Sequence, residues 1–197
     1  MIVSPLAGFL YERWWRVAAS GAARVPAEGG VLLVANHADA LPWSALMVAR
    51  AVPRETRFLL SERAFALPWV SLAARRAGAV PDAPANAERL LREGLAVVMF
   101  PEVGRAPRRH EVARFGDEAF VDVALRTEVP VVPVGVVGGD PLPSRWRIAF
   151  GSPLDLRALG AEDASDRAAV LRAAEAVREQ VQSMVRECLV HREGAFL

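Results

Sequence analysis

Several features that define common protein classes are scarce or absent in this sequence of 197 residues. Its single cysteine, Cys188, cannot form an intramolecular disulfide, so we expect a reducing compartment and, by default, the cytoplasm. The N-terminal apolar segment is interrupted by Glu12 and Arg13 after about ten residues, whereas a membrane-spanning helix needs roughly 20. The sequence therefore predicts neither a secretory signal nor a membrane span.

The chain also has almost no net charge, because 24 basic residues face 23 acidic ones. A protein that displaces many phosphate counterions needs a clear basic surplus, so we expect no nucleic-acid partner. Lysine is absent, and every basic residue is arginine. A GC-rich genome accounts for this bias, and arginine also suits a site where phosphate must be held by a planar fork of donors.

Three signatures of other enzyme classes are missing as well. No Gly-x-Ser-x-Gly elbow follows a predicted strand, which argues against a serine hydrolase. Neither Gly-x-Gly-x-x-Gly nor the P-loop pattern occurs, which argues against a nucleotide-binding enzyme. His37, Asp39, His110 and His191 do not have the spacing of a metal site, so we expect no metal and no cofactor.

What the sequence does contain is enough apolar material for one globular core, since 53% of its residues are hydrophobic and 24% are charged. Apolar residues at helical spacing predict an amphipathic helix from Pro5 to Ala18, within an N-terminal segment 1–20 that precedes a single domain, 21–197. Short apolar runs predict strands at 31–34, 57–60, 79–80, 95–100, 129–137 and 146–150. Helical patterns cover 42–50, 64–76, 85–94, 117–127 and 163–191.

This alternation of strands and helices predicts an α/β fold with a mostly parallel sheet, helices on both faces and a long C-terminal helix. Pro130 and Pro133 interrupt the run 129–137, so we expect that strand to start or bend at the prolines instead of forming an uninterrupted central strand.

Two polar clusters follow predicted strands. Asn36-His37 comes shortly after the strand 31–34, with Asp39 two residues later, and Phe100-Pro101-Glu102-Val103-Gly104-Arg105 lies at the end of 95–100. Ligands of parallel sheets gather beyond the carboxyl ends of the strands, so the two clusters are predicted to share one edge. A neutral imidazole there suits a general base, although a lone histidine and a turn rich in proline and glycine are also common structural features.

Together the clusters resemble those of the glycerolipid acyltransferases, in the phosphate-ester acyltransferase superfamily that includes lysophosphatidic acid acyltransferases. In that family the first motif reads Asn-His, four residues, Asp, and the third reads Phe-Pro-Glu-Gly followed by a pair such as Thr-Arg. Gly78-Ala-Val-Pro81 stands at the place of the glycine-led second motif, and Val129-Pro-Val-Val-Pro-Val134 matches the fourth. The resemblance covers roughly residues 21–156.

The resemblance implies an O-acyltransferase that moves a fatty acyl group from acyl-CoA or an acyl carrier protein to a lysophospholipid or glycerol phosphate. His37 would take the proton from the acceptor hydroxyl, whose oxygen attacks the thioester carbonyl without forming a covalent acyl-enzyme. Glu102, Gly104 and Arg105 would position the acceptor, with Arg105 on its phosphate. The other predicted substrate-binding residues are Asn36, Ser44, Phe100, Pro101 and Arg114.

The expected catalytic aspartate is missing, because its position holds Pro42, or Ser44 if the loop is aligned as a longer one. Three interpretations stay open: Asp39 orients the imidazole, Ser44 orients it weakly in a slow enzyme, or acyl transfer is lost. In the last case the chain is a catalytically silent protein that binds lipid or a partner protein. Val103 also stands where the family has glycine, which stiffens and crowds the backbone there.

Trp14 and Trp15, with Arg13 and Arg16, suit the headgroup layer of an anionic membrane. An amphipathic helix also packs on its own domain, which is the alternative. With acceptors that reside in a bilayer, we expect a cytoplasmic protein in peripheral contact with the inner face of the cytoplasmic membrane. The oligomeric state stays open.

Overall fold

The computed structural model describes residues 8–38, 43–65, 68–102, 110–116, 118–138, 145–161 and 163–190. Its centre is a seven-stranded sheet of order β1-β7-β6-β2-β5-β3-β4. The strands are β1 (Ala18–Ser20), β2 (Val31–Ala35), β3 (Thr56–Leu60), β4 (Ala79–Pro81), β5 (Ala96–Met99), β6 (Val131–Val137) and β7 (Arg147–Phe150). Neighbouring strands are parallel except β6 and β7, which pair antiparallel. The predicted α/β fold with a mostly parallel sheet is confirmed.

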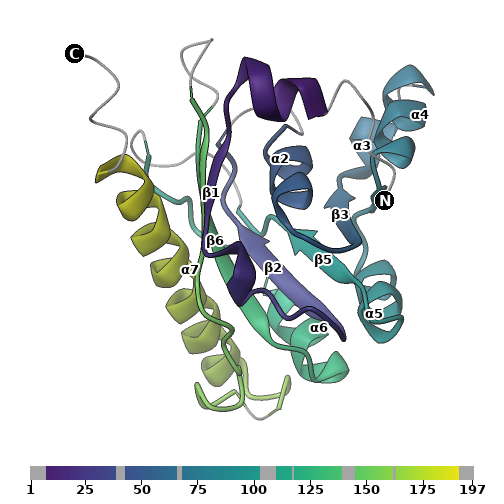
Figure 1. Ribbon diagram of the computed structural model, residues 1–197. Coiled ribbons are helices and arrows are strands. Elements are labelled where there is room, and N and C mark those ends of the chain that lie inside the picture. The colour runs from purple at the N-terminus through teal and green to yellow at the C-terminus, as the bar shows by residue number, and fades with distance from the viewer. Residues whose placement is uncertain are drawn as a thin grey trace.

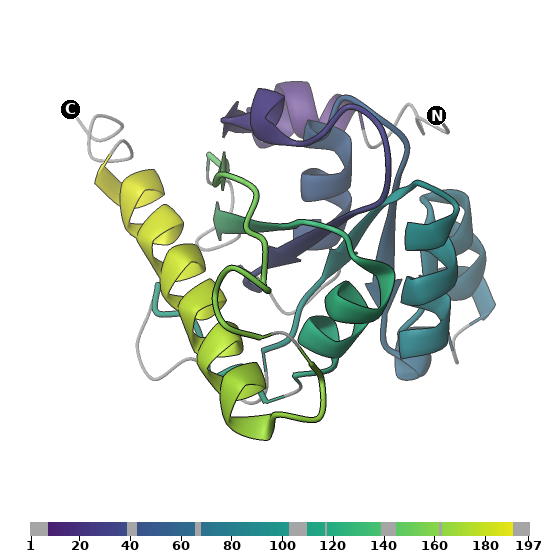
Figure 2. The same cartoon turned by 90° about the horizontal axis from the view of Figure 1, so that it is seen from below.

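Helices cover both faces of this sheet (Figures 1 and 2). One face carries the π-helix η1 (Leu10–Trp14), α2 (Trp43–Ala51), α3 (Glu62–Phe65) and α4 (Pro68–Arg76). The other carries α5 (Pro84–Arg92), α6 (Ala119–Thr127) and α7 (Arg167–Val190). A short 3-10 helix, η2 (Ala22–Arg24), follows β1.

Strand β2 shows why the parallel strands read as continuous apolar runs. Leu32 and Val34 join the core under α5, α6 and α7, whereas Val31, Leu33 and Ala35 join the core under α2. All five residues are fully buried. A strand covered on both faces has no solvent side, so no polar residue interrupts the run.

The N-terminal segment differs from the predicted helix that was to run through Ala18. Helix η1 ends at Trp14, and Ala18–Ser20 form the edge strand β1 beside β7. The N–H of Trp15 donates to the carbonyl of Leu10, a five-residue spacing that is wider than the α-helical turn. The 3.6-residue period therefore assigns the wrong residues to the buried side.

The two neighbouring tryptophans consequently have different surroundings. Trp15 is buried, and its ring lies 5.3 Å from those of both Trp43 and Trp146. Trp14 is 56% exposed, and Phe9, which the helical pattern placed on the buried face, is 53% exposed. Of the two interpretations left open for this segment, Trp15 follows the alternative of packing on its own domain, because its ring lies inside it.

Strand β6 begins at Val131, directly after Pro130 as expected, but the expected interruption at Pro133 is wrong, since the strand runs unbroken past it and lies between β7 and β2. The carbonyl of Pro133 accepts a hydrogen bond of 2.8 Å from the N–H of Gly151. The N–H and carbonyl of a strand residue point toward the same neighbouring strand, which for Pro133 is β7. An N–H at Pro133 would therefore point beyond the end of β7, so its absence breaks no pairing within that strand. Pairing with β2 is unaffected, and Val34 stands opposite Pro133 in register.

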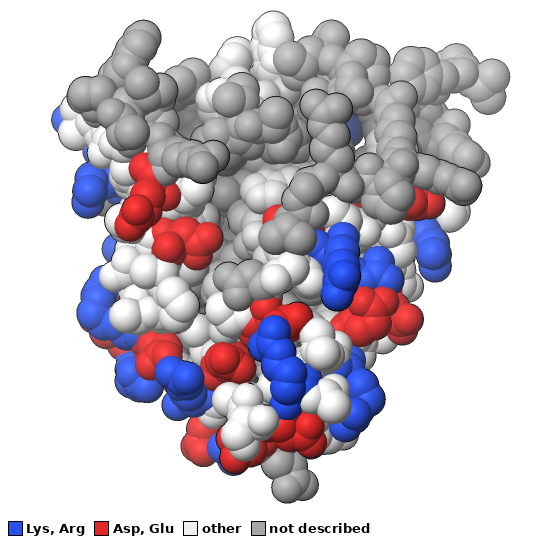
Figure 3. All heavy atoms as spheres, turned by 180° about the vertical axis from the view of Figure 1, so that it is seen from behind, with Lys and Arg blue, Asp and Glu red and all other residues white. Residues whose placement is uncertain are grey.

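The other predicted elements match within a few residues, except that the range 64–76 contains two helices, α3 and α4. On the face seen in Figure 3, acidic and basic side chains are interspersed over the lower half of the molecule. That mixture agrees with the near-zero net charge and gives nucleic acid no single-sign surface there. None of the helices within the described ranges is long and apolar enough to span a membrane.

Candidate active site

The two polar clusters meet at one edge of the sheet, as the sequence predicts. His37 follows β2 and Glu102 follows β5, and these strands are adjacent and parallel, with Val34 opposite Met99. The imidazole of His37 stacks on the ring of Phe100, with the ring centroids 4.4 Å apart and the planes at 21°. The stacking fixes the plane of an otherwise exposed imidazole.

Glu102 joins three segments of the chain through its carboxylate. One oxygen, Oε2, accepts a hydrogen bond from the backbone N–H of His37, and the other, Oε1, accepts one of 2.7 Å from the N–H of Ala113. Hydrogen bonds from backbone N–H groups to a carboxylate are charge-assisted and stronger than neutral ones. In this structure Glu102 therefore holds the loop of the histidine, a task that differs from the acceptor binding implied by the resemblance.

Asn36 extends the ladder of β2 by one residue through its side chain. Its Oδ1 accepts a 2.7 Å hydrogen bond from the N–H of Val136, and its Nδ2 donates over 3.0 Å to the carbonyl of the same residue. Nδ2 also lies 3.4 Å from the carbonyl of His37. Both amide protons have acceptors, so the buried Asn36 fixes the chain direction immediately before His37.

Ser44, in the first turn of α2, performs a similar task on the other side of the histidine. It is fully buried, and its Oγ accepts a 3.1 Å hydrogen bond from the N–H of Ala38. Thus Asn36, Glu102 and Ser44 bind consecutive parts of the backbone around His37. The loop that carries the imidazole is therefore fixed by three side-chain hydrogen bonds to its backbone.

No carboxylate among the described residues is hydrogen-bonded to the imidazole of His37. Asp39, the sequence-predicted partner, lies outside the described residues, as do Gly104 and Arg105. Pro101 is buried, and its carbonyl accepts a 3.2 Å hydrogen bond from Gly116. Arg114 is exposed. The pKa of Glu175 on α7 is lowered, mainly by its hydrogen bond with Arg178 and to the smallest extent by the positive charge of Arg114.

Desolvation shifts the pKa values of His37 and Glu102 in opposite directions. Protein atoms around the imidazole lower the pKa of His37 below its ordinary 6.5, because desolvation penalises the charged form. Desolvation raises the pKa of Glu102 above its ordinary 4.5, while the hydrogen bonds from His37 and Ala113 oppose that rise. A histidine shifted in this direction is mostly neutral at pH 7, the form that accepts a proton.

The segment 110–116, of which only Arg114 was predicted to belong to the site, contributes to it through backbone groups that the sequence did not indicate. It returns beside Glu102, with Phe115 opposite Glu102 in an isolated antiparallel bridge. The N–H of Val112 in this segment donates to Oε1 of Gln182 on α7 over 2.7 Å. The sequence alone could have indicated Gln182, because a glutamine within the apolar stripe of a helix is unusual. It gives no indication of the backbone N–H of Ala113.

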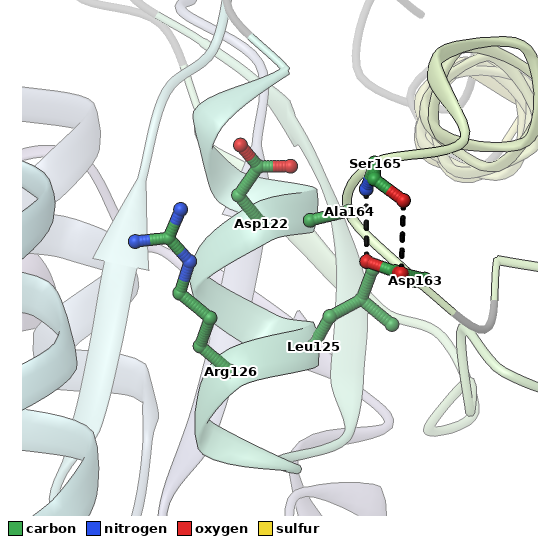
Figure 4. A pocket seen from close by; sticks show the side chains of 6 residues that line it. All are labelled: Asp122, Leu125, Arg126, Asp163, Ala164 and Ser165. Atoms are coloured by element: carbon green, nitrogen blue, oxygen red, sulfur yellow. Dashed lines mark hydrogen bonds between the residues drawn. The ribbon is translucent and has the colours of Figure 1, made fainter.

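A separate cavity of about 490 Å³ lies between α6 and the turn that precedes α7 (Figure 4). Some of its polar groups already have partners: Asp163 accepts hydrogen bonds from the N–H and Oγ of Ser165, and Arg126 pairs with Glu88. None of its lining residues belongs to the segments around His37 or Glu102. The chemistry of the molecule is therefore assigned to the sheet edge and not to this cavity.

Comparison with known proteins identifies related families and folds. A family model described as Acyltransferase matches residues 16–137. Uncharacterized proteins of Mycobacterium bovis and Mycobacterium leprae are each 33% identical over 99% of the chain, which covers 68% and 66% of them. The alignments span 242 residues, more than the chain contains, so these relatives carry extra residues within the matched region.

The fold is similar to that of the 1-acyl-sn-glycerophosphate acyltransferase PlsC from Thermotoga maritima, whose crystal structure gives a TM-score of 0.66. Identity is 22%, and the match covers 87% of this chain and 71% of that one. At this identity the likeness concerns the fold.

Proposed function

The chain belongs to the Acyltransferase family, and from that membership we propose that it moves a fatty acyl group from a thioester to the hydroxyl of a lysophospholipid or glycerol phosphate. The donor is acyl-CoA or an acyl carrier protein. The family resemblance found in the sequence is confirmed by these comparisons.

One observation carries the proposal: Glu102, from the third motif, binds the backbone N–H of His37, from the first. Two segments that the resemblance assigns to one site are thereby in direct contact. A glycerolipid acceptor fits the apolar character of the chain, and the fold neighbour from Thermotoga maritima is itself an acyltransferase for a glycerophosphate acceptor.

In the proposed reaction His37 is the general base. Its lowered pKa keeps the imidazole neutral, so a ring nitrogen can take the proton of the acceptor hydroxyl while the oxygen attacks the thioester carbonyl. The thiol leaves and the ester forms without an acyl-enzyme. Stacking on Phe100 and the three backbone anchors hold the ring in place, which lowers the entropic cost of reaching the reactive geometry.

Two further parts of the proposal concern residues outside the described ranges. Asp39 orients the imidazole from the loop that follows it, and Gly104 with Arg105 binds the phosphate of the acceptor. Peripheral membrane contact is proposed through the exposed Phe9 and Trp14 of the N-terminal helical segment, flanked by the exposed Arg13 and Arg16.

The test is acyl transfer from a panel of acyl-CoAs and acyl carrier proteins to lysophosphatidate, other lysolipids and glycerol 3-phosphate, with products identified by mass spectrometry. The proposal expects an ester product with at least one pair, and none with His37→Ala. Absence of transfer from every donor, with lipid binding retained, would favour the catalytically silent alternative.

A further inference from the structure

Helix α7 has one buried polar side chain in the middle of its apolar stripe. Gln182 is only 9% exposed, next to the fully buried Val181 and near Val185. The helix is seated closely on β6 at this point, because a Cβ on Gly135 would lie 2.5 Å from Cβ of Met184. A buried amide in so tight a contact needs partners for its polar atoms.

Those partners are backbone groups of the segment that follows the third motif. Oε1 of Gln182 accepts the 2.7 Å hydrogen bond from Val112, and its Nε2 donates to the carbonyl of His110 over 3.3 Å. The segment passes beside α7 in Figure 1. The two hydrogen bonds fix the segment to the helix on both sides of Glu111.

The next residue along the segment connects this attachment to the histidine. Ala113 donates its N–H to Oε1 of Glu102, and Oε2 of the same carboxylate accepts the N–H of His37. Every link is a direct hydrogen bond except the peptide between Val112 and Ala113. A shift of the segment away from α7 therefore withdraws one of the two donors that hold the Glu102 carboxylate.

We propose that Gln182 is a positioning residue for His37, acting through Val112, Ala113 and Glu102, so that the C-terminal helix sets the placement of the catalytic loop. The inference rests on the proposed function for its effect on catalysis, but the linkage itself does not. Charged side chains beside Gln182 are Glu111, Arg178, Glu179 and Arg186, which line a shared cavity. The bridge between His110 and Val112 is made by the amide and not by these charged groups.

The experiment compares Gln182→Met, which keeps the length of the side chain and removes both hydrogen bonds, with Gln180→Met, on the same helix and exposed. Backbone amide exchange is followed by NMR at His37, Val112 and Ala113. We expect exchange at all three to accelerate at least tenfold in Gln182→Met and less than twofold in Gln180→Met. In acyl transfer, kcat should fall about tenfold with KM nearly unchanged, since small misplacements of a catalytic group cost up to roughly 100-fold.

Unchanged exchange at His37 and Ala113 in a folded Gln182→Met protein would overturn the inference. If the wild-type protein transfers no acyl group while the variant still exposes these amides, the proposed function fails and the linkage stands. Should Gln182→Met not fold, Gln182→Glu is used instead, because it keeps the acceptor for Val112 and loses the donor to His110. Gln182→Glu should then accelerate amide exchange at His37 by less than tenfold but by more than Gln180→Met does. Equal exchange rates at His37 in these two variants would overturn the inference.

Discussion

The carboxylate of Glu102 accepts a hydrogen bond from the backbone N–H of His37, although the two residues are 65 positions apart in the chain. The contact spans two adjacent parallel strands and ties the ends of both together. The carboxylate of Glu102 accepts a second hydrogen bond, from the N–H of Ala113, and so also binds the segment that leads to α6. The acidic residue of the third motif thus holds the loop of His37 through its backbone, while His37 keeps an exposed part.

Glu102→Gln should lower kcat by about 10- to 100-fold. A glutamine offers one acceptor oxygen, so either His37 or Ala113 faces an N–H group, and a lost hydrogen bond to a charged group is worth about 1.5–3 kcal/mol. Steady-state kinetics on the purified variant measure the effect. Glu62→Gln is the control, since Glu62 is exposed on α3 and should leave kcat within twofold. Equal effects of the two substitutions would contradict the positioning role.

The pH dependence of kcat/KM should show an acid limb with its midpoint below 6.5. Desolvation lowers the pKa of His37 from that ordinary value, so the neutral base persists to more acidic pH than in a fully solvated histidine. The profile of kcat/KM reports the free enzyme, which is the state that the structure represents. A midpoint above 6.5 would mean that a negative charge, and not desolvation, dominates at the imidazole.

Asn36→Leu should destabilise the fold by about 2–6 kcal/mol in urea unfolding, because it leaves the N–H and carbonyl of Val136 buried without partners, at roughly 1–3 kcal/mol each. Asn86→Leu provides the comparison, since Asn86 is half-buried and makes one 2.9 Å hydrogen bond to Pro81. Its substitution should cost about 1 kcal/mol. An Asn36 variant no less stable than the Asn86 variant would show that the backbone pairing at Val136 is dispensable.

Asp39→Asn should reduce turnover far more than Ser44→Ala. Loss of the orienting carboxylate in the serine-protease triad lowers turnover by about 10⁴, which sets the upper scale for Asp39. Ser44→Ala removes the hydrogen bond to Ala38 and should cost about 1 kcal/mol of stability, with turnover reduced less than tenfold. Single-turnover rates and unfolding of both variants make the comparison, and equal or reversed effects on turnover would remove Asp39 from the mechanism.

The burial of Ser44 also bears on a variant that restores the family aspartate at this position. Ser44 is fully buried, so Ser44→Asp places a carboxylate where desolvation is costly. We expect a less stable protein and no gain in activity.

The parallel core was predictable because its strands are buried on both faces and read as unbroken apolar runs. The edge strand β1 was not, since Ala18, Ala19 and Ser20 are small, exposed residues whose strand conformation comes from pairing with β7. Pro133 misled the prediction of β6 for a geometric reason: whether proline breaks a strand depends on which neighbour its nitrogen faces. The sequence does not reveal that neighbour.

For the site, the sequence located His37 and Glu102 through their places after two strands, and its assignment of Glu102 to the acceptor stays a prediction. The structure shows it bound to backbone groups of His37 and Ala113, which have no signature in a sequence. Ser44 was predicted as a substitute for the missing acid, and its contact with Ala38 depends on a loop geometry that spacing alone does not define.

The central claim is that His37 is the base of an acyl transfer, and the most direct measurement is the single-turnover rate of ester formation by wild-type protein and His37→Ala with one productive donor and acceptor. General-base catalysis contributes about 10²- to 10⁴-fold, so the variant should be slower by that factor while acceptor binding changes little. Ester formation at the same rate in both proteins would contradict the claim.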